Sequence, residues 1–169
     1  MSGTDGLRAR PAGPADAAAI ARIHNQGIDE GTATFETRRR NGADVSGWFE
    51  PRFPVVVVES DGEVVAFAST SEYRPRDCYA GIAEFSVYVD RAQRGQGLGT
   101  AAMEALFDAA RAAGFWKLVS RVFVENLPSR ALLEDLGFRE VGIYERHAQL
   151  RGVWKDVVIV ERLLNVDRE

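Results

Sequence analysis

The chain has 169 residues, 46% hydrophobic and 27% charged, which is ordinary for one globular domain with a hydrophobic core of its own. Its 21 basic and 25 acidic side chains give a formal net charge of −4, which argues against nonspecific nucleic-acid binding because such binding needs a basic surface. A single cysteine, Cys78, excludes an intrachain disulfide, and no apolar segment resembles a signal peptide or a membrane span, so we expect a cytoplasmic protein without a membrane partner.

The first half of the chain predicts a strand, two helices and a β-hairpin. Pro14 suits the first turn of a helix, and Ile20, Ile23 and Gly27 then recur on one helical face. The polar residues 1–6 are expected to form a flexible tail. The expected elements are a strand at 7–10, a helix from 14 to about 29, a loop at 31–37, a short helix at 44–49, and strands at 54–59 and 63–73 around the turn signal Asp61-Gly62.

The second half alternates strands with helices and ends in two strands. The expected elements are a loop at 74–78, a strand at 82–90, a helix at 98–113, a strand at 118–124, a helix at 126–136, and strands at 138–149 and 154–164. The segment 82–124 is a β-α-β crossover, so its two strands should be parallel with a right-handed connection. An apolar stripe on its helix comprises Leu98, Ala102, Leu106, Ala109 and Ala113. This order predicts one mixed α/β domain over residues 7–169 with a largely antiparallel sheet.

The run Arg94-Gly95-Gln96-Gly97-Leu98-Gly99 lies between the strand and the helix of that crossover. A glycine-rich turn there exposes backbone N–H groups at a helix N-terminus, where the macrodipole also favours an anion. A nucleotide P-loop is excluded because the turn has no lysine, and the dinucleotide fingerprint fails because Thr100 stands where a third glycine is needed. The turn therefore favours another diphosphate, with a tight turn that binds nothing as the alternative.

The pattern Arg-x-x-Gly-x-Gly resembles the acetyl-coenzyme A pyrophosphate loop of the GNAT superfamily of N-acetyltransferases. That resemblance implies a single-domain N-acetyltransferase fold whose two parallel strands splay apart to admit the pantetheine arm. Asn126 and Ser129 match superfamily positions that reach the cofactor, with helix capping as an equally good and compatible reading. The implied acetyl-coenzyme A contacts are Val87, Tyr88, Val89, Arg94, Gly95, Gln96, Gly97, Leu98, Gly99, Thr100, Asn126 and Ser129.

Segments across the chain are more specifically similar to the phosphinothricin acetyltransferase family. They are residues 34–37, 73–79, 84–89 and 152–158, and residues 83–89 with 114–118 are most similar to its arsinothricin-resistance branch. The resemblance implies transfer of an acetyl group to the α-amino group of phosphinothricin, methionine sulfoximine or arsinothricin, as a detoxification. It also implies a homodimer with the active site near the interface. A family histidine is replaced by Arg151 in this chain, so no catalytic duty can be carried over from it.

Glu84 is the candidate general base. Strand alternation places Glu84, Ser86 and Tyr88 on one face and the apolar residues between them on the other. The family places a general-base glutamate here, and a carboxylate can take the proton of an ammonium acceptor directly or through water. The alternative is a structural ion pair with a nearby arginine.

Three further residues are candidates for acceptor binding. The loop arginines Arg74 and Arg76 match the family's substrate-binding loop, and guanidinium groups suit a carboxylate or an oxyanion. Phe35 is a candidate wall for the aliphatic part of the acceptor. The alternatives are a solvated basic loop for the arginines and ordinary core packing for Phe35. No spacing suits a metal, because His24 and His147 are far apart in sequence.

Two rival functions remain open at the level of the sequence. One is acetyl transfer to a different amine, such as a polyamine or a protein N-terminus, which a pair of acceptor-site arginines argues against. The other is a coenzyme A-binding sensor without catalysis, which the presence of Glu84 argues against only weakly.

Overall fold

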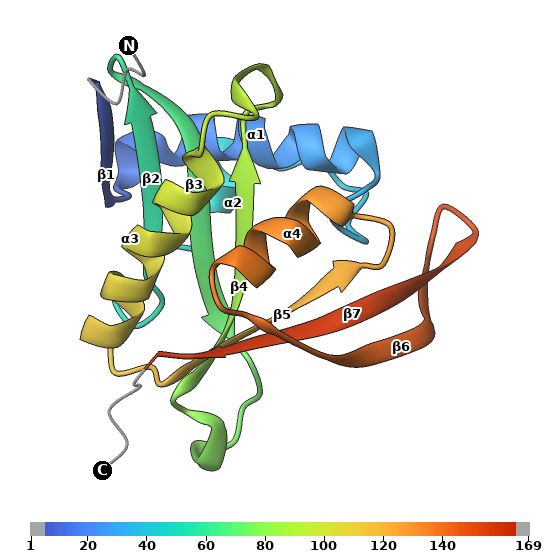
Figure 1. Cartoon of the computed structure of the whole chain (residues 1–169). Coiled ribbons are helices and arrows are strands. Elements are labelled where there is room, and N and C mark those ends of the chain that lie inside the picture. The colour runs from blue at the N-terminus through green and yellow to red at the C-terminus, as the bar shows by residue number, and fades with distance from the viewer. Residues whose placement is uncertain (1–5, 165–169) are drawn as a thin grey trace.

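The computed structural model describes residues 6–164, so the expected tail at 1–6 lies outside the described residues except for Gly6. A seven-stranded mixed sheet carries helices on both faces (Figure 1). The elements are β1 Leu7–Pro11, η1 Pro14–Asp16, α1 Ala17–Glu30, α2 Gly42–Ser46, β2 Val55–Ser60, β3 Glu63–Glu72, η2 Asp77–Tyr79, β4 Ile82–Val89, η3 Arg91–Gln93, α3 Leu98–Ala112, β5 Lys117–Phe123, α4 Leu127–Asp135, β6 Arg139–Leu150 and β7 Val153–Leu163. The order of strands and helices predicted from the sequence is confirmed.

The sheet has the strand order β1-β2-β3-β4-β5-β7-β6. All neighbours are antiparallel except β4 and β5, which pair in parallel over three positions only, from Ile82↔Lys117 to Glu84↔Val119. Beyond Glu84 the two strands separate, which leaves one edge of β4 open. The predicted parallel, splayed strand pair is therefore present.

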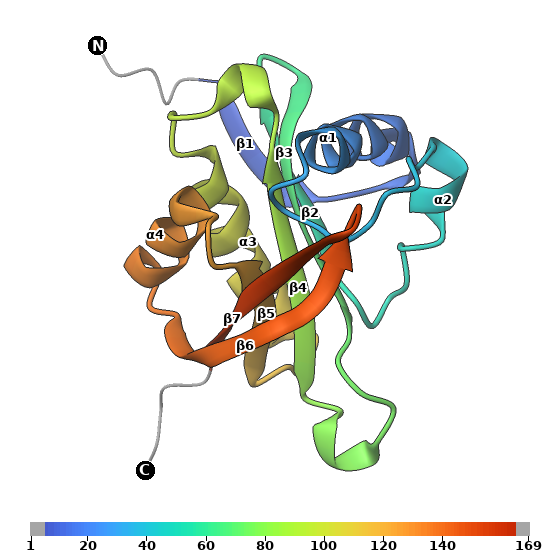
Figure 2. The same cartoon turned by 90° about the vertical axis from the view of Figure 1, so that its right-hand side faces the viewer.

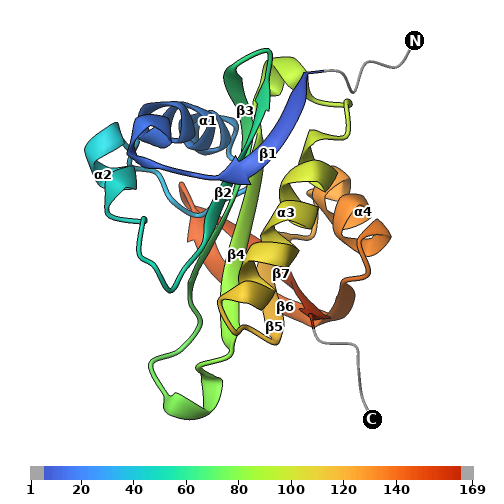
Figure 3. The same cartoon turned by 90° about the vertical axis from the view of Figure 1, so that its left-hand side faces the viewer.

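The two faces of the sheet bury separate cores. Figures 2 and 3 show α1 and α2 on one face and α3 and α4 on the other. Phe85, Leu106 and Leu118 belong to the core under α3, whereas Ile20 and Phe67 belong to the core under α1. Because side chains alternate along β4, its odd-numbered residues pack under α3 and its even-numbered residues face the α1 side.

Three local expectations need correction. The short helix is α2, which begins earlier than expected because Asn41 and Asp44 form a reciprocal capping box. The apolar stripe of α3 passes through Ala110 instead of ending at the exposed Ala113. The end of the loop expected at 74–78 overlaps η2, a single 3-10 turn at Asp77–Tyr79.

Candidate active site

A cavity of about 520 Å³ lies along the open edge of β4. It extends between the N-terminus of α3, the N-terminus of α4 and the C-terminal end of α1. All of the predicted cofactor contacts line it except Gln96, whose side chain donates to Gln93. Other lining residues are Ile23, Gly27, Glu30, Thr32, Ala33, Glu125, Pro128 and Leu132.

The three glycines of the turn, Gly95, Gly97 and Gly99, are required for two different physical reasons. Gly95 and Gly97 have φ of 81° and 76°, a region that favours glycine, and a Cβ at either position would meet no atom of residues 6–164 within 4 Å. A ligand can therefore approach the backbone there. Gly99 differs, because its Cβ would lie 2.9 Å from Leu132 Cδ2, so this glycine permits close packing of α3 on α4.

The free edge of β4 presents backbone N–H groups to the cavity. Amide groups point to alternate edges along a strand. The Asp90 N–H donates to the Val65 carbonyl of β3, whereas the Phe85 carbonyl on the opposite edge accepts from Ser120 Oγ of β5. By this alternation the amides of Val87 and Val89 point to the open edge, where a pantetheine amide can pair with them as a third strand would.

Arg94 has a partner that sequence reasoning missed. Its guanidinium forms a two-pronged ion pair with Glu30, at 2.9 Å and 2.8 Å, and both residues line the cavity. Glu30 is the last residue of α1, 64 positions away in sequence. No local signal pairs these residues, so the carboxylate beside the anion site emerges only from the fold.

Asn126 carries out the capping role. Its side chain accepts a hydrogen bond from the Ser129 N–H at the start of α4 and donates one to the Thr32 carbonyl, at 3.2 Å. The capping interpretation is thus confirmed, and it is compatible with cofactor contact because Asn126 and Ser129 both line the cavity.

Glu84 lies at the point where β4 and β5 separate, on the face away from α3. It does not line the cavity. Its carboxylate forms a 2.9 Å ion pair with Arg121 Nη2 of β5, and Arg121 Nη1 lies 3.5 Å from His147 Nε2 of β6. The ion pair with a nearby arginine, which the sequence left open as the alternative role of Glu84, is therefore present. Side-chain alternation along β5 would have predicted from the sequence that Arg121 lies on this face. That Arg121 lies next to Glu84 follows only from the pairing of β4 with β5.

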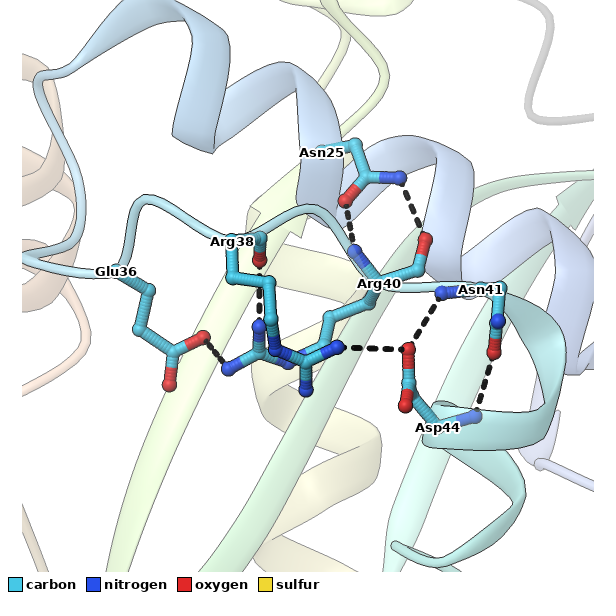
Figure 4. Close-up of polar contacts among 6 residues, drawn as sticks. All are labelled: Asn25, Glu36, Arg38, Arg40, Asn41 and Asp44. Atoms are coloured by element: carbon cyan, nitrogen blue, oxygen red, sulfur yellow. Dashed lines mark hydrogen bonds and ion pairs between the residues drawn. The ribbon is translucent and has the colours of Figure 1, made fainter.

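Phe35 packs in the way that its alternative interpretation expects. Its ring meets Phe123 edge to face at 4.8 Å, beside the small core of Phe123, Leu150 and Val157. This contact anchors the segment between α1 and α2. The Asn25 amide on α1 anchors the far end by bonding both backbone groups of Arg40, at 2.7 Å and 2.8 Å (Figure 4).

Arg74 and Arg76 are exposed on the β3–β4 connection, which projects beyond the strands (Figure 2). Their guanidinium groups lie over the rings of Tyr73 and Tyr79, at 5.2 Å and 5.9 Å. A hydrogen bond with Tyr73 raises the pKa of Arg74. Neither arginine lines the cavity, so the structure does not bring them to the cofactor side.

Arg151, at the family histidine's position, lies in the turn between β6 and β7 with φ of 49°. Its Nη2 lies 3.5 Å from the Ile28 carbonyl, near the C-terminus of α1. A cation is favourable at that end of a helix. The contact ties the hairpin tip to α1.

Within residues 6–164, no three His, Cys, Asp or Glu side chains are grouped as a metal site would require. No helix in the same range is both long and apolar enough to cross a membrane.

A cofactor-sized cavity beside two separating parallel strands, under a glycine turn, is the arrangement of a coenzyme A-dependent N-acyltransferase. A model described as the acetyltransferase (GNAT) family matches residues 24–138. The chain therefore belongs to the GNAT family of acetyltransferases, which makes it an N-acetyltransferase.

Individual proteins agree with this assignment. The chain is 34% identical over 163 residues to an L-methionine sulfoximine/L-methionine sulfone acetyltransferase of Pseudomonas paraeruginosa, covering 94% of both proteins. It is 30% identical over 159 residues to a phosphinothricin N-acetyltransferase of Streptomyces viridochromogenes, covering 90% of this chain and 85% of the relative. An acetyltransferase of Salmonella typhimurium, solved with its cofactor acetyl-CoA, matches with a TM-score of 0.90 and 30% identity over 98% of both chains. These likenesses support the predicted phosphinothricin acetyltransferase-like family.

Proposed function

We propose that this enzyme transfers the acetyl group of acetyl-CoA to the α-amino group of a small amino-acid analogue, such as methionine sulfoximine, phosphinothricin or arsinothricin. Methionine sulfoximine and phosphinothricin appear in the names of relatives that match most of the chain. Arsinothricin rests on the sequence resemblance alone. Detoxification of such a compound in the cytoplasm would be the biological role.

The observation that carries the proposal is the position of Glu84. Its carboxylate lies where β4 and β5 part, a few residues before Val87, the first β4 residue that lines the cavity. A thioester delivered along the open edge of β4 would reach this point. A base is needed there, because an ammonium group must lose a proton before it can attack.

Transfer is direct in this proposal. Glu84 accepts a proton from the ammonium group, and the amine lone pair then attacks the thioester carbonyl carbon to form the new C–N bond. An amide N–H of the open β4 edge, at Val87 or Val89, stabilises the oxyanion. The C–S bond breaks as the oxyanion collapses, and the coenzyme A thiolate takes up the second amine proton.

The cofactor would bind with its pyrophosphate over residues 95–99. Backbone donors of the turn and the guanidinium of Arg94 complement the negative charge. Because Arg94 is paired with Glu30, a diphosphate would compete with that carboxylate for the guanidinium.

Acceptor recognition would involve the projecting loop. Arg74 and Arg76 are exposed, and their stacking on tyrosine rings orients guanidinium groups that an anionic head group can bind. Phe35 packs on Phe123, and in this proposal its ring would also wall the aliphatic chain of the acceptor.

The proposal is tested by measuring coenzyme A thiol release with a panel of acceptors. The panel contains methionine sulfoximine, phosphinothricin, arsinothricin, ordinary amino acids, a polyamine and a peptide with a free N-terminus. Preferential turnover of the amino-acid analogues is expected. Preference for the polyamine or the peptide would favour the rival acetyltransferase, and coenzyme A binding without turnover of any acceptor would favour the sensor.

We also propose that a second copy of the chain covers the β6–β7 hairpin. β6 is the edge strand of the sheet, and the apolar residues Val141, Ile143, Val153 and Trp154 of the hairpin are about half exposed. Exposed apolar side chains gathered at an edge are typical of an interaction surface. Light scattering should give a dimer for the wild type and a monomer for Trp154→Glu. A monomeric wild type would contradict the homodimer.

A further inference from the structure

Arg121 is a half-exposed arginine that the proposed chemistry leaves without a role. Its Nη2 donates to Glu84 Oε1 at 2.9 Å, and its side chain is 49% exposed. A guanidinium has five N–H donors in one plane, and within residues 6–164 the contacts with Glu84 and His147 engage two of them. The remaining donors can receive another carboxylate.

The position of Arg121 relative to the separating strands matters. Val119 is the last residue of β5 that pairs with β4, opposite Glu84, and Arg121 is the next residue on the same face. The ion pair therefore bridges β4 and β5 where the strands part. An acceptor that approaches Glu84 meets Arg121 at the same time.

We infer that Arg121 binds the α-carboxylate of the acceptor while Glu84 receives its α-ammonium group. This inference rests on the proposed function. In an α-amino acid the ammonium nitrogen and the carboxylate are attached to one carbon, so their receptors must also be neighbours. Glu84 and Arg121 are such neighbours with the opposite charges, whereas Arg74 and Arg76 lie on the projecting loop. The loop arginines are then left for the anionic head group.

His147 of β6 restricts the position of Arg121. His147 lies in an irregular part of β6, where the register with β7 shifts between Tyr144 and Ala148. The Asp156 carboxylate fixes this bulge by accepting the Arg146 N–H at 2.7 Å. The imidazole of His147 then stands 3.5 Å from the guanidinium, and it limits the directions in which Arg121 can turn.

The pair also discriminates by charge. A zwitterion adds no net charge when it inserts between Glu84 and Arg121, and each of its charged groups gains an opposite partner. A polyamine or a peptide N-terminus has no carboxylate beside its amine, so Arg121 would face a second cation or stay unpaired. Such a mismatch disfavours the wrong ligand.

The test compares two acceptors that differ in one group. Methionine sulfoximine and the amine obtained by removing its α-carboxylate are assayed with wild type, Arg121→Gln and Arg121→Lys at saturating acetyl-CoA. Arg121→Gln should raise KM for methionine sulfoximine at least about tenfold, the usual effect of losing a charge-assisted hydrogen bond. Its kcat/KM for the amine should stay within about threefold of wild type. Arg121→Lys keeps the charge without the planar fork, so it should fall between the two.

The matched control is Arg22→Gln, because Arg22 is 50% exposed and forms a 2.8 Å ion pair with Asp90 away from Glu84. It should leave both acceptors unchanged. Equal losses for both acceptors in Arg121→Gln would overturn the inference, because they would mean that Arg121 only positions Glu84. So would an unchanged KM for methionine sulfoximine. If the wild type itself acetylates no amino-acid acceptor, the proposed function fails instead, and that result is visible before any variant is compared.

Discussion

The cofactor side and the acceptor side of this site are built in different ways. About half of the residues that line the cofactor side belong to one stretch, from the end of β4 through the glycine turn into α3, and the cofactor groups expected there are backbone N–H donors. On the acceptor side, Glu84, Arg121 and His147 come from β4, β5 and β6, 37 and 26 residues apart in sequence. Backbone groups on the cofactor side suit a co-substrate that is always the same. Side chains on the acceptor side can be substituted for a new acceptor without changing the glycine turn.

The largest effect should come from Glu84→Gln. The amide keeps the shape and an oxygen that can accept from Arg121, but it cannot take a proton. General-base loss costs about 10²–10⁴-fold in rate, so we expect kcat to fall by that factor. Stopped-time thiol-release assays measure the rate, and calorimetry should show coenzyme A affinity close to wild type. Activity within a few-fold of wild type between neutral and mildly alkaline pH would exclude Glu84 as the base.

A smaller effect should follow from Arg74→Ala and Arg76→Ala. Each removes one guanidinium from an exposed loop, so KM for acceptors with an anionic head should rise about tenfold while kcat changes little. Acceptors without such a head, assayed in parallel, serve as the control. If neither substitution changes KM for any amino-acid acceptor, head-group recognition by the loop is wrong, and an amine without an anionic head becomes the better candidate.

On the cofactor side, Arg94→Gln and Glu30→Gln should act in opposite directions. Losing the guanidinium should weaken coenzyme A binding several-fold, a modest effect because Arg94 is half exposed and solvent screens its charge. Losing the carboxylate frees Arg94 for the pyrophosphate and should strengthen binding a few-fold. Calorimetry with coenzyme A and with pantetheine, which has no phosphate group, separates a pyrophosphate effect from a general one. If the wild type, Arg94→Gln and Glu30→Gln bind coenzyme A with equal affinity, the assignment of Arg94 to the phosphate site is wrong.

The smallest effect should come from the titration of His24, a buried residue of α1, and it concerns the stability of the fold. His24 of α1 is buried between Trp48 and Tyr88, and burial lowers its pKa. Its Nδ1 has no hydrogen-bond partner among the residues that the structure describes. The unfolded imidazole takes up a proton below about pH 6.5, so the unfolded state binds more protons there and stability falls as pH decreases.

We therefore expect the Tm of the wild type to drop more between pH 7.5 and pH 5.0 than the Tm of His24→Phe. Phenylalanine keeps an aromatic ring against Trp48 and Tyr88 without a titrating group. Calorimetric melting at both pH values measures the two drops, and other ionisable groups cancel in the comparison. Equal drops would show that His24 does not supply this pH dependence.

The elements themselves were largely predictable because their signals are local. Apolar runs between turn signals indicated the strands, and the hairpin turn Asp61-Gly62 connects β2 and β3 as expected. The errors arose where a side chain overrode the pattern. Asn41 and Asp44 set the start of α2. The strand expected at 138–149 is present as β6, and the bulge that Asp156 holds in it was not predicted.

The sequence by itself determined the turn at residues 94–99, the alternation that exposes Glu84 and the order of elements that makes β4 and β5 parallel. Each of these depends on residues a few positions apart, where the geometry of a strand or a turn is fixed. Only the tertiary structure decided that Glu30 faces Arg94, that Phe35 packs on Phe123, and that Arg121 stands beside Glu84. Those contacts join distant segments, so they depend on strand order and on how far β4 and β5 stay paired, which no local pattern encodes.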